Sequence, residues 1–216
     1  MDKQLEQRFI EAEVRLFEEE NKPKIRGQIP FDSLSVNLGG FKERIRKGAF
    51  KRSLVEGRDI RALFNHSTDK PLARTSTGTL LLTETDNGLD IEITPNNASW
   101  SKDVQETIRS GDLNGFSFGF FVTEDEWDNE GGQVVRELID LDLVEVSPVF
   151  QPAYKASEIA VRIAPDAIEA AKRYADQDAV EANLDAIEER KPEPNNSYEI
   201  ELKRKQLDLL KLKLSM

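Results

Sequence analysis

The sequence lacks cysteine altogether and contains one histidine among its 216 residues. Without cysteine the chain has no disulfide framework, no thiolate metal site and no cysteine nucleophile. A single histidine cannot form a histidine-rich metal site, so we expect neither a metal nor another cofactor. Any nucleophile that the chain uses is therefore expected to be an oxygen atom.

Basic charge and long apolar runs are also scarce. The chain has 41 acidic and 30 basic residues, and its net charge of -11 disfavours contact with nucleic acid or an anionic membrane, since both attract basic surfaces. No apolar run approaches the length of a membrane span, and the N-terminal "MDKQLEQRFIEAEVRLFEEE" has charges where a signal peptide needs apolar residues. We expect a cytoplasmic protein that binds neither nucleic acid nor membrane.

The length favours one substantial domain with an appendage. From residue 60 to residue 150, short apolar or alternating runs are separated by Gly, Pro, Asn and Asp, which is typical of a mostly antiparallel sheet. We expect this sheet to be closed or nearly closed, giving an α+β fold with a β-barrel-like core and peripheral helices. Apolar spacing predicts helices over 41–57 and 99–111 and a strand over 25–31. The first twenty residues fit either a helix or an outer strand.

The composition changes after Tyr154, and this break divides the chain. We assign residues 1–160 to the folded domain. Residues 161–197 form an acidic segment, helical or disordered, that ends in the linker "KPEPNNS". Residues 198–216 carry leucines at the spacing of an amphipathic helix, which we expect to dock on its own domain or on a second copy.

His66 is the first candidate for chemistry. It follows the apolar run "IRALFN" directly, where a strand gives way to the polar loop "HSTDKP". A histidine can act as a general base because its unperturbed pKa lies near neutrality. A lone histidine at the end of a strand is nevertheless more often a surface or hydrogen-bonded residue, so His66 alone does not identify a site.

Ser117 lies in "NGFSFGF" and is either a packed serine or a nucleophile. A small residue between aromatics on a strand often marks tight packing. Gly115 and Gly119, however, allow another backbone or a substrate to approach. The flanking phenylalanines would face the opposite side of the strand and anchor it.

The third candidate, Glu145, lies in the strand-like run "DLDLVEVSPV". In an uninterrupted strand it shares a face with Leu141 and Leu143, whereas Asp142 lies on the other face. A carboxylate in such an apolar setting could orient an imidazole and stabilise its protonated form. An edge-strand carboxylate that points to solvent explains the same pattern equally well.

Four segments in order resemble the prohead maturation proteases of tailed bacteriophages, over roughly Ile25 to Tyr154: "GGFKERIRKGAFKRSL", "ALFNHSTDKPLARTSTGTLLLTETDNGLDIEI", "LNGFSFGF" and "LVEVSPVFQPAY". Four ordered motifs are far more specific than any one of them. The resemblance implies a serine protease domain over residues 1–160, with a fold similar to the herpesvirus assembly protease, a largely antiparallel β-barrel surrounded by helices.

The resemblance also implies roles for the three candidates. His66 in "NHS" falls on the family's general base, Ser117 in "GFSFGF" on its nucleophile and Glu145 on the third catalytic position. Asp142 is the alternative third member, and strand alternation predicts that only one of the two carboxylates points into the site. Donors for the oxyanion are not located. The candidates are backbone amides near Ser117 or around the "PLARTSTG" loop, with the Arg74 side chain as a further contributor.

The implied function is that of a serine endopeptidase acting during prohead maturation. Its substrates would be the scaffold-like part of the major capsid protein and the protease itself, with a homo-oligomer also compatible. Its place would be inside the immature prohead in the cytoplasm of the bacterial host. The alternative is a non-catalytic assembly or scaffolding factor that keeps a protease-like domain.

Overall fold

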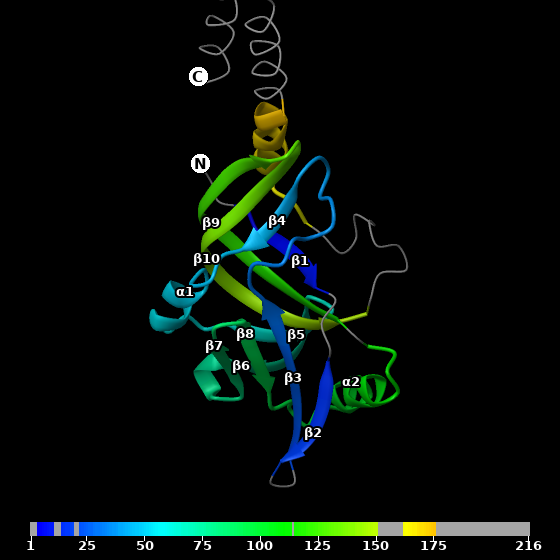
Figure 1. The fold of residues 1–216 in the computed structure, drawn as a ribbon. Coiled ribbons are helices and arrows are strands. Elements are labelled where there is room, and N and C mark those ends of the chain that lie inside the picture. The colour runs from blue at the N-terminus through cyan, green and yellow to red at the C-terminus, as the bar shows by residue number, and fades with distance from the viewer. Residues whose placement is uncertain (1–3, 11–13, 20–21, 114, 151–161, 176–216) are drawn as a thin grey trace, which may run out of the picture.

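The computed structural model describes residues 4–10, 14–19, 22–113, 115–150 and 162–175 (Figure 1). In these ranges the chain is mostly β, with ten strands in two sheets. None of the helices in the described ranges has both the length and the apolar character needed to cross a membrane.

The larger sheet has six strands and is built on a long antiparallel hairpin. Its path is β1-β9-β10-β5-β6, and β4 joins β10 beside that path. Both β4 and β5 run parallel to β10, one along its first half and the other near its end, so the sheet is mixed. The bounds are β1 Glu6–Ile10, β4 Lys42–Ile45, β5 Arg61–Phe64, β6 Ser67–Arg74, β9 Gly115–Glu130 and β10 Gln133–Val149.

The smaller sheet has four antiparallel strands in the order β2-β3-β8-β7. Alternating burial along β3 places Ile25 and Ile29 in the core, as expected of the strand predicted over 25–31. The bounds are β2 Arg15–Glu19, β3 Lys22–Pro30, β7 Leu80–Glu84 and β8 Gly88–Ile93.

Helices cover the ends and edges of the sheets. The predicted helix over 99–111 is confirmed as α2 (Ser99–Arg109), which buries Val104 and Ile108. A short α1 (Lys51–Val55) follows β4, and the 3-10 turn η1 (Thr75–Thr77) follows β6. Residues 165–175 form a further helix, gold in Figure 1, near the hairpin end of β9 and β10.

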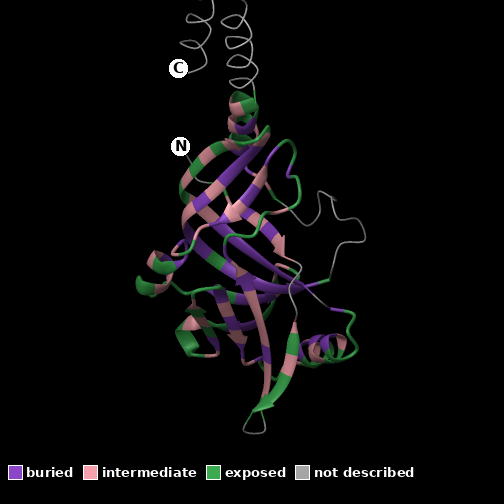
Figure 2. Cartoon of the chain, viewed as in Figure 1, coloured by how far each residue is buried: buried purple, intermediate pink, exposed green. Residues whose placement is uncertain are grey.

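The main core lies between the two sheets, where buried positions face each other across the strands (Figure 2). Phe116, Phe118 and Phe120 of β9 are fully buried there together with residues of β3 and β8. A second, smaller cluster forms at the other end of the hairpin, where Ala167 and Ala171 pack near Phe41. The first core supports the face of β9 opposite to Ser117.

Two sequence predictions about the fold are wrong. The sheets do not close into a barrel: among the described strands, β1 and β6 end one sheet and β2 and β7 end the other. The helix predicted over 41–57 is strand β4 followed by a turn and the short α1. Gly48 lies in the turn between β4 and α1 with a φ of 97°, a left-handed conformation that a continuous helix cannot contain.

The first twenty residues, whose sequence fits either a helix or an outer strand, contain strands β1 and β2. The helix expected over 198–216 and most of the acidic segment 161–197 lie outside the described residues.

Candidate active site

The β5–β6 hairpin presents His66 in a two-residue turn. Phe64 pairs with Ser67, so Asn65 and His66 are the two central residues, with φ values of 49° and 59°. Positive φ at both positions is the signature of a type I′ turn, and asparagine and histidine tolerate this region better than most residues. The turn is tied to the end of β10, because the Asn65 amide donates to the Pro148 carbonyl at 3.2 Å.

His66 contacts Glu145 directly. The distance from His66 Nδ1 to Glu145 Oε1 is 2.5 Å, and the side chains are 22% and 6% exposed. An ionised carboxylate can only accept a hydrogen bond, so in this contact Nδ1 is the donor when Glu145 is ionised, and Nε2 faces away from Glu145 as the other ring nitrogen. The pair has the arrangement of a base oriented by an acid.

The second carboxylate oxygen of Glu145 is held by Ser147. Ser147 Oγ donates to Glu145 Oε2 at 2.5 Å and accepts the backbone N–H of His66 at 3.3 Å. Gly119 lies opposite Glu145 on β9, and a Cβ at that position would lie 2.7 Å from Glu145 Oε1. The bare glycine thus leaves room for the carboxylate.

Ser117 lies on the same face of the sheet as this pair. It is the cross-strand neighbour of Ser147, as Gly119 is of Glu145, and directly paired residues project to the same side. The phenylalanines on either side of Ser117 are buried in the core on the opposite face, as the sequence predicted. The side chain of Ser117 is therefore anchored from behind by the core.

The Ser117 hydroxyl does not point its proton at the imidazole. Ser117 Oγ donates to the backbone carbonyl of Arg8 on β1 at 2.9 Å, and Ser117 is 1% exposed. A hydroxyl has a single proton to donate. The structure thus brings His66 and Glu145 into contact and places Ser117 on their face of the sheet, with its hydroxyl engaged by β1.

Asp142 points to the same face as Glu145, contrary to the prediction from strand alternation. Leu143 pairs with Phe120 and Glu145 with Gly119, so Val144 is an extra residue in β10 and is exposed. This β-bulge reverses the alternation and brings Glu145 to the outer face.

The ionic partners distinguish the two carboxylates. Asp142 accepts a hydrogen bond from Arg52 of α1 and lies 3.2 Å from Arg58. Asp140, followed by Asp142, raises the pKa of Arg52 by hydrogen bonding to its guanidinium. Asp142 is therefore engaged in an ionic cluster with α1, whereas Glu145 contacts the imidazole.

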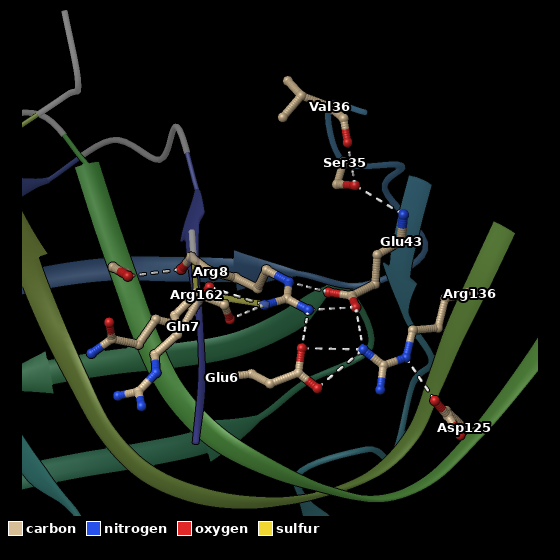
Figure 3. A network of polar contacts seen from close by, with 10 residues as sticks. Glu6, Gln7, Arg8, Ser35, Val36, Glu43, Asp125, Arg136 and Arg162 are labelled. Carbon is tan, nitrogen blue, oxygen red and sulfur yellow. Dashed lines mark hydrogen bonds and ion pairs between the residues drawn. The ribbon is translucent and has the colours of Figure 1, made fainter. Parts of the chain in front are cut away.

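Five charged side chains form a network on the side of β1 (Figure 3): Glu6, Arg8, Glu43, Asp125 and Arg136. Arg8 donates from Nε to Glu43 at 2.7 Å and from Nη2 to Glu6 at 2.5 Å. Arg136 also donates to both carboxylates. Burial lowers the pKa of Arg8, but Glu43 and Glu6 outweigh it, so the net pKa lies above the ordinary value.

The outer edge of β1 is bound as well. Arg8 Nη1 donates to the carbonyl of Arg162 at 2.8 Å, and the main chains of Gln7 and Arg162 exchange hydrogen bonds of 3.0 and 3.1 Å (Figure 3). The strand whose carbonyl accepts the Ser117 hydroxyl is thus held from both sides.

A family model described as Caudovirus prohead serine protease matches residues 11–173. The chain belongs to this family. The resemblance to prohead maturation proteases is therefore confirmed, and with it the assignment to a family of serine proteases that act in capsid maturation. No curated protein matches the chain.

The fold of this family member is similar to a solved structure, that of the bacteriophage T4 capsid assembly protease, gp21. The TM-score is 0.50 at 10% sequence identity, over 70% of this chain and 100% of the other. At that identity the likeness concerns the fold alone.

Arg74, a candidate oxyanion donor for this family member, lies away from His66. It pairs with Arg61 at the end of the β5–β6 hairpin remote from the turn, and its guanidinium is bound to Asp59. Among the described residues, no group of three or more histidines and carboxylates is placed to hold a metal ion.

Ser147 and Arg8 were missed at the sequence level. Ser147 had a signal in the sequence, since it stands two residues after Glu145 and so shares its face in a regular strand. Arg8 had none, because the carbonyl that contacts Ser117 depends on a pairing between strands that are far apart in the chain.

Proposed function

We propose that the chain is a serine endopeptidase in which Ser117 is the nucleophile, His66 the general base and Glu145 the residue that orients His66. The observation that carries the proposal is the 2.5 Å contact between Glu145 Oε1 and His66 Nδ1, on the face of the sheet that also carries Ser117. Membership of a serine protease family supports the chemistry.

The mechanism is acyl transfer. His66 Nε2 takes the proton of Ser117 Oγ, and the oxygen attacks the carbonyl carbon of a peptide bond. The C–N bond then breaks as His66 gives this proton to the leaving amine, and an acyl-enzyme remains. A water molecule deprotonated by His66 attacks the ester, and Ser117 is released with its proton restored. Glu145 stabilises the imidazolium in both halves of the reaction.

The hydrogen bond to Arg8 must be exchanged for one to His66 before this chemistry begins. Ser117 is nearly inaccessible beneath its neighbours, and its only proton is engaged by the Arg8 carbonyl. A hydrogen bond between nucleophile and base often tightens only in the complex with substrate. The described arrangement is therefore a resting form of the proposed enzyme.

The proposed substrates are the scaffold-like part of the major capsid protein and the chain itself, cut inside the immature prohead. The family description supports this assignment because it places its members in the prohead of tailed phages. The fold-level likeness to a capsid assembly protease agrees with it.

Intact mass measurement tests the proposal. Wild type and Ser117→Ala are each co-expressed with the major capsid protein of the same virus, and proheads are confirmed by electron microscopy. We expect shortened capsid protein and self-cleaved fragments from wild type and only full-length chains from Ser117→Ala. Ser101→Ala is the matched control, since Ser101 is also fully buried but lies on α2, and it should cleave like wild type.

Full-length capsid protein in all samples with assembled proheads would remove the catalytic proposal. The alternative of a non-catalytic assembly factor would then replace it. Cleavage by Ser117→Ala at the wild-type rate would instead reject Ser117 as the nucleophile.

A further inference from the structure

We propose that Ser147 is a positioning residue, whose hydroxyl fixes the Glu145 carboxylate in the orientation that pairs with His66. The proposal rests on the roles of His66 and Glu145 in the proposed function. It adds a fourth residue to the site, which holds the Glu145 carboxylate in place relative to the His66 imidazole.

The first support is that one hydroxyl binds both partners. Ser147 has one proton, which goes to Glu145 Oε2, and lone pairs, one of which accepts the His66 backbone N–H. The bond to the carboxylate, at 2.5 Å, is as short as charge-assisted O–H···O⁻ bonds usually become. Ser147 thereby couples the carboxylate to the backbone of the turn that presents the imidazole.

The second support is that each oxygen of the Glu145 carboxylate has its own hydrogen-bond partner. His66 Nδ1 engages Oε1 and Ser147 engages Oε2, so rotation of the carboxylate would break two bonds. Gly119 lets the group lie close over β9. Ser147 is 0% exposed, so bulk water is not at hand to replace its hydroxyl.

The third support is the place of Ser147 in the sheet. It pairs directly with Ser117 across the β9–β10 ladder. Strand pairing, rather than a loop, therefore fixes the position of Ser147, and of the groups that it binds, relative to Ser117. Functional groups mounted on regular elements are held more precisely than groups on loops.

Loss of the Ser147 hydroxyl should therefore weaken the contact with Glu145 that orients His66. Glu145 Oε2 would be left without this donor in a buried site, and the carboxylate would turn away from His66 to find another. A misplacement of about 1 Å can cost on the order of 10²-fold in rate, and we expect a loss of that size for Ser147→Ala.

The activity test uses full-length variants in the co-expression assay, with the cleaved fraction of capsid protein followed over time. Ser147→Ala should lose on the order of 10²-fold in rate, and Ser147→Thr, which keeps a hydroxyl, should recover most of it. Ser53→Ala is the matched control. Ser53 is also 0% exposed and hydrogen-bonds the β10 backbone at Leu141 and Leu143, but its hydroxyl does not contact Glu145.

A double-mutant cycle tests whether Ser147 acts through Glu145. In a Glu145→Gln background, Ser147→Ala should cause little further loss, because the group that it positions has already been changed. Two independent, additive losses would overturn the proposal, as would a wild-type rate for Ser147→Ala.

A spectroscopic test needs no activity. His66 is the only histidine, so the chain made without a histidine tag gives one set of imidazole signals by NMR. In Ser117→Ala protein, the Nδ1 proton should appear as a low-field signal of a strong hydrogen bond. That signal should vanish when Ser147→Ala is added and persist when Ser53→Ala is added.

The activity and spectroscopic tests together separate this proposal from the proposed function. An unchanged low-field signal in the Ser147→Ala protein would overturn the positioning role whatever the activity. A signal that behaves as expected, together with a wild-type chain that never cleaves capsid protein in assembled proheads, would support the positioning role and reject the proteolytic function.

Discussion

At the scale of single residues, the absence of a side chain at Gly119 is as important to the candidate site as any side chain present. Glycine usually weakens a strand, because it loses more backbone entropy on folding than other residues and has no side chain to pack. Here the space above the glycine is occupied by the Glu145 carboxylate. Gly115 has the same function for another side chain, because a Cβ there would lie 2.3 Å from the ring of Phe9.

Gly119→Ala should therefore reduce activity while preserving the fold. The new Cβ would lie 2.7 Å from Glu145 Oε1, and the carboxylate is the group that must move. We expect a loss on the order of 10²-fold in capsid cleavage. Thermal unfolding of the same sample checks that the variant remains folded. A folded variant with wild-type cleavage and an unchanged His66 low-field signal would contradict the prediction.

At the scale of elements, β1 depends on charge more than on apolar packing. Four of the charged groups that hold it, Glu6, Arg8, Glu43 and Arg136, have side chains no more than 5% exposed. Replacing such a group leaves the charges of its buried partners uncompensated, which strongly destabilises the fold. An exposed ion pair, by contrast, contributes little to stability. These buried charges therefore add to the β1–β9 ladder in holding β1 in place.

Arg8→Met should destabilise the protein by about 3–5 kcal/mol, since Glu6 and Glu43 would each lose a buried partner. Urea unfolding measures this change. Arg26→Met is the matched control, because Arg26 also pairs with two carboxylates but its side chain is 42% exposed, and it should change stability by less than about 1 kcal/mol. Equal effects of the two substitutions would refute the distinction.

At the scale of the whole molecule, carboxylates on both sheets respond to acid in the same direction. The hydrogen bond from Arg46 holds the pKa of Glu137 below its ordinary value of 4.5, and the bond from Lys24 does the same for Glu92. The unfolded chain therefore binds these protons at a higher pH than the folded protein. Their contribution to stability is complete above pH 4.5 and is lost as the pH falls below it.

Acid should thus lower the free energy of unfolding below pH 4.5, and Glu137→Gln should make that decline shallower. Urea titrations of both proteins between neutral pH and the acid range measure the effect. Glu126→Gln is a suitable comparison, since the Glu126 side chain is 63% exposed and shares the same Arg46. An identical acid dependence of wild type and Glu137→Gln would contradict the prediction.

The sequence by itself was sufficient to identify the family, to predict a β-rich fold and to select His66, Ser117 and Glu145 as candidates. The catalytic roles of these three residues remain predictions. These inferences depend on local patterns, such as the alternation around Ser117 and the order of four motifs. The tertiary structure alone decided what depends on contacts between distant segments. It left the sheets open, brought Glu145 to the outer face through the bulge at Val144, and joined Ser117 to Arg8. A one-residue bulge reverses every following side chain, and no local pattern in the sequence marks where pairing with another strand will create it.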